Sequence, residues 1–219
     1  MNWVLTMFED TGIFANLSRL NRTTKHLTLL FLIDQSQSKV LLGLKKRGFG
    51  VNKFNGFGGK LEPGETVLEG ALREMEEESG IKLQTASYAA HVYFEFEGKD
   101  ELMSVHILRA FTNINEITEA KESEEMRPVW FSFLDTKQLP WNEMWIDDFY
   151  WLPYVLQGKV FRAHFLFRGH DQIISHIIKE VESCSEEEWC KEQLSLITIE
   201  RDALPQKSID IDFGIKKEI

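Results

Sequence analysis

The feature that most constrains the fold is a glycine-rich segment followed directly by a helical pattern. Residues 48–64 contain six glycines and Pro63. Because glycine permits backbone conformations that are closed to other residues, we expect a loop with sharp turns here. Residues 66–79 then contain strong helix formers with apolar residues at helical spacing, and Gly80 supplies a C-terminal stop. The sequence therefore predicts a loop that leads into a helix with one apolar and one acidic face.

Short apolar runs on both sides of this segment predict strands. Residues 27–33 and 40–44 are separated by a polar segment, which predicts a hairpin. Further strands are expected at residues 87–97, 103–111, 128–131 and 159–167. A helix is expected at residues 147–157, between the last two strands. Strands on both sides of helices indicate a layered α/β core.

The end of the chain is less constrained by pattern. Residues 161–178 could form a hairpin or a strand and a helix, because periodicity does not separate the two. Residues 186–202 could form a short amphipathic helix. With 219 residues, the chain suits one domain of ~100–200 residues plus extensions. We expect the domain at residues 26–183, an N-terminal extension at 1–25 and a C-terminal extension at 184–219.

Charge and cysteine content narrow the class of protein. The net charge is -10 and the pI about 5.2, so nucleic acid is not an expected partner. No apolar run approaches the ~20 residues that span a bilayer, so no membrane partner is expected. Cys184 and Cys190 are the only cysteines and predict neither a zinc site nor a disulfide framework. We expect a soluble, monomeric, cytoplasmic protein, with nuclear and mitochondrial locations as alternatives.

Three carboxylates lie together on the predicted helix. Glu74, Glu77 and Glu78 are spaced i, i+3 and i+4, which places them on one helix face. Such crowding is costly without a cation, and Mg²⁺ takes oxygen ligands and neutralises phosphate. The helix therefore indicates Mg²⁺-dependent hydrolysis of a phosphoanhydride, with Mn²⁺ as an alternative cation. Arg73 can orient Glu77 by an i,i+4 ion pair. The alternative is an acidic face that is merely solvated.

The spacing favours the metal site. From Gly59 the chain reads GKLEPGETVLEGALREMEEESGI, which resembles the Nudix box. The matching positions are Gly59, Glu65, Arg73, Glu74, Met75, Glu77, Glu78, Gly80 and Ile81. Seven fixed residues at frequencies near ~6% make a chance match in the chain rarer than about one in a million. The chain is therefore identified as a member of the Nudix family.

Resemblance to the Nudix family implies an α+β fold, an α/β/α sandwich with a mixed β-sheet. It also implies that Glu74 and Glu78 hold the principal metal ion, with Glu77 as a further ligand or supporting base. A carbonyl of Gly58 or Gly59 would add a metal ligand. Water would then attack phosphorus in line.

The same resemblance gives roles to three more residues. Glu65 and Arg73 would brace the loop and the helix. Glu125, in the string EEMRP, matches a carboxylate near the metal. It is a candidate water-activating base or additional ligand.

The resemblance extends to a substrate class. Residues 27–181 look like the oxidised purine nucleoside triphosphatases, the animal homologues of MutT. The matching strings are LLGLKKRGFG, NGFGGK, ELM, EEMRP and MWIDD followed by FYWLP. They imply hydrolysis of 8-oxo-dGTP and 2-hydroxy-dATP to the monophosphate and pyrophosphate. One departure is Ile146, where a proline is expected, and this could shift the neighbouring aspartates.

Two other functions remain open at this point. One is a Nudix enzyme for another diphosphate, such as a dinucleoside polyphosphate, a methylated purine nucleotide or ADP-ribose. The other is a binding module that holds a nucleotide without cleaving it. Such modules usually lose a metal carboxylate, and this chain keeps all of them.

A purine pocket is also expected. Flat or polarizable side chains that could sandwich the base are Phe49, Phe94, Met103, Met126 and Trp145. Each could instead pack in the core. Asn55 offers a donor and an acceptor for a base edge, and Thr28 matches a position that lines the same pocket in the resembling enzymes.

Two adjacent aspartates could complete this pocket. In a dry site Asp147 and Asp148 would share a proton and so present one donor and one acceptor. The alternative is that one of them caps the following helix. Lys45 matches another pocket position and belongs to a basic group made of Lys45, Lys46, Arg47, Lys53 and Lys60. This group could favour a triphosphate or simply be solvated.

Overall fold

The computed structural model describes residues 23–112 and 120–187. Within it, the segment Arg22–Glu186 forms one compact unit. Strand β1 begins at Thr23, inside the segment expected as an N-terminal extension. The rest of that extension and most of the helix expected at residues 186–202 lie outside the described residues.

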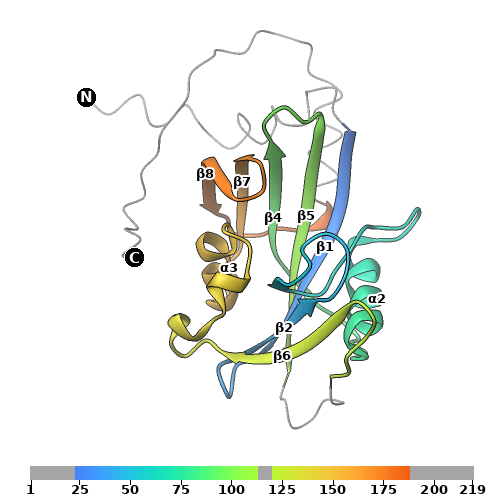
Figure 1. The fold of residues 1–219 in the computed structure, drawn as a ribbon. Helices are drawn as coiled ribbons and strands as arrows, with labels where there is room; N and C mark the ends of the chain where they lie inside the picture. The colour runs from blue at the N-terminus through green and yellow to red at the C-terminus, as the bar shows by residue number, and fades with distance from the viewer. Residues whose placement is uncertain (1–22, 113–119, 188–219) are drawn as a thin grey trace. The chain divides into compact units, whose positions relative to one another are not determined.

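One mixed sheet organises the described residues (Figure 1). Its strands are β1 (Thr23–Asp34), β2 (Lys39–Lys45), β3 (Phe54–Asn55), β4 (Ser87–Phe96), β5 (Glu101–Thr112), β6 (Met126–Ser132), β7 (Phe161–Arg168) and β8 (Gln172–Glu180). Their order is β3-β2-β1-β5-β4-β7-β8, and β6 pairs with β2. The pairs β1–β5 and β4–β7 are parallel, and the others are antiparallel. The expected mixed sheet is confirmed.

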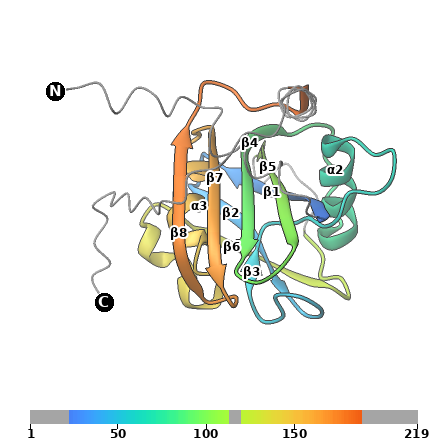
Figure 2. The same cartoon turned by 90° about the horizontal axis from the view of Figure 1, so that it is seen from above.

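Two α-helices cover opposite faces of this sheet (Figures 1 and 2). Helix α2 (Val67–Ser79) packs in one core cluster with Leu30 and Leu32 of β1, and α3 (Asp148–Leu156) packs in the other with Phe31 and Ile33. Successive residues of one strand therefore serve both layers. Short 3₁₀ helices, η1 (Thr136–Gln138) and η2 (Trp141–Glu143), precede α3. The α/β/α sandwich is confirmed.

No helix among the described residues is long and apolar enough to cross a membrane.

The predicted strands and helices are present with small shifts of their ends. The first hairpin is antiparallel, with Leu32 opposite Leu41. The segment that could have been a hairpin or a strand and a helix is the hairpin β7–β8. Its turn contains Gly169 at φ 65°, in the left-handed region that favours glycine.

Helix α2 begins and ends as its sequence indicates. Thr66 caps its N-terminus in a reciprocal pair with Glu69. At the other end Gly80 has φ 70°, and its N–H donates to the Glu76 carbonyl at 2.8 Å. The apolar residues at helical spacing, Val67, Ala71 and Met75, are all fully buried. These contacts fix which face of the helix carries the carboxylates.

The glycine-rich segment is more regular than the loop expected from its sequence. It contains β3 and then runs beside β1, where Thr28 N–H donates to the Gly59 carbonyl at 2.9 Å. Phe57 and Leu30 exchange two further bonds, of 2.7 and 2.9 Å. A Cβ on Gly58 would lie 2.1 Å from the Thr28 carbonyl oxygen. Glycine is needed at this position because the two backbones approach so closely.

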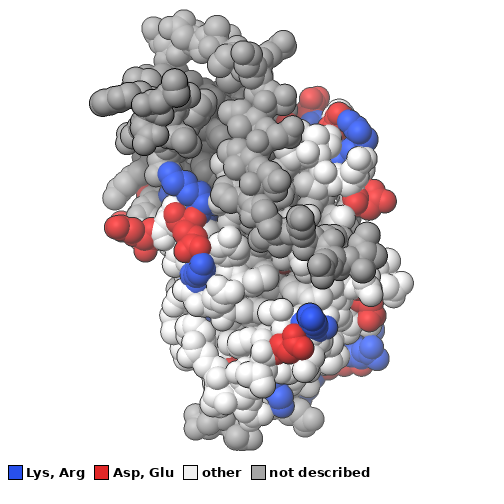
Figure 3. All heavy atoms as spheres, turned by 90° about the vertical axis from the view of Figure 1, so that its left-hand side faces the viewer, with Lys and Arg blue, Asp and Glu red and all other residues white. Residues whose placement is uncertain are grey.

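Charge on the surface is mixed. On the face that carries α3 and β8, acidic and basic side chains lie close together between uncharged residues (Figure 3). Ion pairs at the two ends of β7 join Lys159 with Glu180 and Arg168 with Glu97. As far as the described residues show, this face has no continuous basic surface of the kind that binds duplex nucleic acid.

Two histidines are buried in the sheet. His91 of β4 and His106 of β5 stack with their ring centroids 4.5 Å apart, and His91 Nε2 lies 2.7 Å from the Ser104 hydroxyl. Burial, together with the charge of neighbouring histidines, lowers the pKa of both, for His106 to about 3. The folded protein therefore keeps these rings neutral well below pH 6.5.

The contribution of these two histidines to stability should consequently fall in mild acid, while Asp147 and Asp148, whose pKa values are raised, contribute with the opposite sign. An unfolded histidine binds a proton near pH 6.5, whereas the folded protein excludes it, so unfolding takes up protons below that pH. Each of the two histidines should cost up to about 1.4 kcal/mol of unfolding free energy per pH unit below about 6.5. Urea unfolding of the wild type and of His106→Gln between pH 7.5 and 5 measures this loss as the difference between the two proteins. Relative to the wild type, His106→Gln should gain stability as the pH falls, and a difference that does not change with pH would contradict the assignment.

Candidate functional site

Two cavities meet along the glycine segment. The first, the aromatic cavity, has a volume of about 530 Å³. The second, the acidic cleft, has about 630 Å³. Both are lined by Lys45, Arg47, Gly58, Gly59 and Glu125. A ligand could therefore lie with one end in each.

The aromatic cavity brings together every residue expected in a purine pocket. These are Thr28, Lys45, Phe49, Asn55, Phe94, Met103, Met126, Trp145, Asp147 and Asp148. Side chains that the sequence did not point to also line it, among them Leu27, Leu29, Phe96, Val105, Trp151, Phe167 and His170. Phe96 could have been found from the strand period of two, since it follows Phe94 on the same face. Phe167 depends on the pairing of β7 with β4, which the sequence does not reveal.

Aromatic rings surround the mouth of this cavity. Phe49 is 60% exposed and stacks on Trp145 with centroids 4.9 Å apart, and His170 meets Phe49 edge-on at 5.4 Å. Lys53 donates to the Met144 carbonyl at 2.8 Å, and its ammonium lies 5.0 Å from the Trp145 ring centroid. Lys53, expected in a basic group for phosphates, thus helps to hold the tryptophan in place.

The aspartate pair lies at the base of the aromatic cavity and is almost completely buried. Asp147 stands at the N-cap position of α3, but its side chain makes no capping bond. It accepts instead from Trp151 Nε1 at 2.9 Å, while Asp148 accepts from the Trp145 N–H at 3.0 Å. The capping alternative is therefore wrong for Asp147, which lines the aromatic cavity.

Burial dominates the electrostatics of this pair. Desolvation raises the pKa of Asp147 to about 6. Desolvation also raises the pKa of Asp148 well above its ordinary value, helped by the charge of Asp147. Two adjacent buried carboxyls disfavour the state in which both are ionised, and this favours a proton shared by the pair. With one proton, the pair would present one hydroxyl donor beside one carboxylate acceptor.

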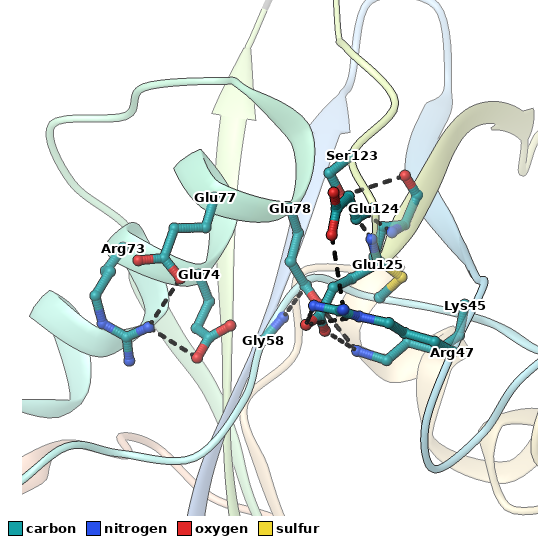
Figure 4. Close-up of polar contacts among 11 residues, drawn as sticks. Lys45, Arg47, Gly58, Arg73, Glu74, Glu77, Glu78, Ser123, Glu124 and Glu125 are labelled. Atoms are coloured by element: carbon teal, nitrogen blue, oxygen red, sulfur yellow. Dashed lines mark hydrogen bonds and ion pairs between the residues drawn. The ribbon is translucent and has the colours of Figure 1, made fainter.

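In the acidic cleft, Arg73 connects the loop to the helix. Its guanidinium meets the Glu65 carboxylate through two bonds, of 2.8 and 3.0 Å. It also donates to Glu74 at 2.9 Å and to Glu77 at 3.3 Å (Figure 4). The bond from Arg73 lowers the pKa of Glu65. Arg73 thus joins the loop to the helix, at the place where the family resemblance implies a brace formed by Glu65 and Arg73.

Glu78 is the most buried carboxylate of the cleft, at 3% exposure. Its Oε2 accepts from the Gly58 N–H at 2.9 Å and its Oε1 from Lys45 Nζ at 3.1 Å. Burial raises its pKa, and half-burial does the same for Glu74. Gly59 is glycine for a related reason, because a Cβ there would lie 2.4 Å from the Glu74 carboxylate.

Glu125 approaches the cleft from the other side, directly before β6. Lys45 Nζ lies 3.1 Å from its Oε2, and the Arg47 guanidinium pairs with its Oε1 (Figure 4). The bond from Arg47, followed by that from Lys45, lowers the pKa of Glu125. A carboxylate held in this way is a weak proton acceptor.

The cleft has the chemistry of a divalent-cation site. As they stand, no three His, Cys, Asp or Glu side chains among the described residues converge on one point, because Glu74 turns to Arg73 and Glu78 to Lys45. The lining nevertheless holds six carboxylates against four basic side chains, and oxygen ligands suit Mg²⁺. The Gly59 carbonyl is engaged by Thr28, which favours the Gly58 carbonyl as a backbone ligand.

Comparison with known proteins identifies the family. The model of the NUDIX domain matches residues 24–153, and the chain belongs to this family.

Its relatives include two animal enzymes. The chain is 48% identical to the oxidized purine nucleoside triphosphate hydrolase of Danio rerio, over 73% of this chain and 97% of that protein. It is 49% identical to the enzyme of the same name from Mus musculus, over 74% of this chain and 99% of that protein. A mutator MutT protein from Bacillus halodurans has the same fold, with a TM-score of 0.59 at 24% identity over 71% of this chain and 97% of that one.

The two adjacent glycines should respond differently to an added methyl group. Gly58→Ala drives a Cβ into the β1 backbone and should lower the free energy of unfolding by about 3 kcal/mol. Gly59→Ala meets only the end of the Glu74 side chain, so stability should change by less than about 1 kcal/mol. The displaced carboxylate should weaken Mn²⁺ binding by about 10-fold. Urea unfolding and calorimetry measure both effects, and equal destabilisation by the two variants would contradict this geometry.

Proposed function

We propose that this protein hydrolyses oxidised purine nucleoside triphosphates, such as 8-oxo-dGTP and 2-hydroxy-dATP, to the monophosphate and pyrophosphate. The observation that carries the proposal is the continuity of the two cavities, which places a buried aspartate pair at one end and the carboxylates of α2 at the other. The two animal relatives, each matched over almost its whole length, are oxidized purine nucleoside triphosphate hydrolases, which supports the same substrate class.

The aromatic cavity suits a purine. Its walls are mostly aromatic and apolar, and its volume of about 530 Å³ is in the range of small-molecule sites. The Thr28 hydroxyl is buried on its wall without a hydrogen-bond partner among the described residues. Asn55 Oδ1 accepts from the Gly56 N–H at 2.8 Å, which leaves its NH₂ group to donate. The Thr28 hydroxyl and the Asn55 NH₂ group would therefore form hydrogen bonds with the edge of the base.

The aspartate pair would give the preference for oxidised bases. When the pair holds one proton, one carboxyl can donate and the other can accept. Because the single proton can also move to the other carboxyl, the pair can match either a keto and N–H edge or a hydroxyl edge. Oxidised guanine and oxidised adenine differ in this respect, so one site could accept both.

The phosphates would then extend into the acidic cleft. Glu74 and Glu78, with the Gly58 carbonyl as a further ligand, would hold Mg²⁺, which supplies positive charge to the phosphate oxygens when bound. Glu77 would be either another ligand or a supporting base. Lys45 and Arg47 line both cavities and can bind the chain of phosphates.

The chemical step needs a base for water. A water oxygen forms a bond to phosphorus, the bridging P–O bond breaks in line, and the water proton passes to a carboxylate. Glu77 is 60% exposed and can take this proton. The lowered pKa of Glu125 favours a role for it in holding Lys45 and Arg47 over that of the base.

Removal of one carboxylate charge should stop turnover. Glu78→Gln keeps the shape of the side chain but weakens cation binding, and kcat/KM should fall at least about 1000-fold. Glu76→Gln is the matched control, since Glu76 lies on the same helix and pairs with Lys82 outside the cleft. Steady-state pyrophosphate release measures both variants, with thermal melting to check the fold. Turnover by Glu78→Gln at the wild-type rate would sink the proposal.

Base preference should depend on the aspartate pair. Asp147→Asn cannot ionise or exchange a proton with Asp148, so one protonation pattern is lost. The ratio of kcat/KM for 8-oxo-dGTP to that for 2-hydroxy-dATP should change by about 10-fold or more. Asp135→Asn, an exposed position outside both cavities, serves as the control. An equal loss on both substrates would argue against base reading by the pair.

A further inference from the structure

Lys45 occupies an unusual place between the two cavities. It ends β2, and its side chain is 19% exposed. Its ammonium lies 3.1 Å from Glu78 Oε1 and 3.1 Å from Glu125 Oε2 (Figure 4). It thus bridges a carboxylate of α2 and one that directly precedes β6. Burial opposes its charge, but Glu78 and Glu125 outweigh this effect and raise its pKa.

Both oxygens of the Glu78 carboxylate already accept a hydrogen bond. One oxygen accepts from Lys45 and the other from the Gly58 N–H. A divalent cation that takes Glu78 as a ligand needs one of these oxygens. An ammonium and a metal ion repel each other strongly at such a distance, so they cannot share Oε1.

We propose that Lys45 is a displaceable counter-ion for Glu78. A divalent cation that binds Glu78 displaces the ammonium, and the freed lysine then binds the phosphates of the nucleotide. Metal binding and triphosphate binding are thereby linked through one side chain. This inference rests on the proposed function, because it concerns the same metal and phosphate site.

Lys45 differs from its neighbours in ways that fit this role. Lys46 pairs with Glu122 at 2.7 Å and donates to the Ser123 carbonyl at 2.7 Å, so it does not contact the carboxylates of α2. Arg47 is 59% exposed and pairs with Glu124 and Glu125. A lysine ammonium is also a point charge on a flexible stem. It can therefore turn from Glu78 to a phosphate while its backbone stays paired in the sheet.

Calorimetry with Mn²⁺ and no nucleotide tests the displacement. Lys45→Met removes the competing cation, and Mn²⁺ should bind about 10-fold more tightly. Lys46→Met is the matched control, because it removes the same charge one residue away and should change the affinity less than about 3-fold. Should Lys45→Met fail to melt cooperatively, Lys45→Gln keeps a donor for Glu78 without the charge and carries the same expectation.

A second titration tests the coupling between metal binding and triphosphate binding. The α,β-imido analogue of 8-oxo-dGTP cannot be cleaved at that bridge, so binding is measured without turnover. In the wild-type protein the analogue should tighten Mn²⁺ binding. In Lys45→Met this enhancement should be smaller by about 10-fold, and Lys46→Met should retain it.

The outcomes separate the inference from the function on which it rests. Failure of the wild-type protein to bind Mn²⁺ would remove the metal site and with it the proposed function. Mn²⁺ binding by the wild type with no gain in Lys45→Met would overturn the counter-ion role alone. An equal gain in Mn²⁺ affinity in Lys46→Met would also overturn the counter-ion role, because the loss of one positive charge would then explain both results.

Discussion

The hydrogen bond from the Gly58 N–H to Glu78 joins the glycine segment to the carboxylate helix, and Gly58 lines both cavities. It forms because the glycine segment pairs with β1 through Phe57 and Gly59, which turns the intervening N–H toward α2. A side chain at residue 58 would push the segment away from β1 and open the site. Glycine is therefore needed at residue 58 so that the segment can lie close to β1. This close packing brings the Gly58 N–H to the Glu78 carboxylate in the acidic cleft.

Much of this organisation could be predicted from local sequence. Thr66, Glu69 and Gly80 define the ends of α2, and the spacing of its carboxylates gives their common face. Short apolar runs predicted the strands, because a strand that is covered on both faces is apolar at successive positions. The base-pocket residues came from resemblance to related enzymes, because an aromatic residue in a strand has the same local pattern whether it packs in the core or lines a cavity.

What the sequence could not supply depends on contacts between distant segments. The hairpin β7–β8 and the place of Phe167 beside Phe96 follow from strand pairing, which local periodicity does not encode. The partners of Lys45 and Lys53 are 33 to 91 residues away along the chain. The run of basic residues therefore gave no sign that Lys45 meets a carboxylate of α2 or that Lys53 contacts a tryptophan.

We propose that the aromatic cavity and the acidic cleft bind two parts of one substrate, the purine and the phosphates. The most direct test of this proposal is a comparison of kcat/KM for the purified protein with Mg²⁺ on 8-oxo-dGTP, 2-hydroxy-dATP, dGTP, ADP-ribose and a dinucleoside polyphosphate, with products identified. The account predicts that the oxidised triphosphates are preferred over dGTP by at least about 10-fold and yield the monophosphate and pyrophosphate. Preference for ADP-ribose or the dinucleoside polyphosphate, or equal rates on dGTP and 8-oxo-dGTP, would contradict it.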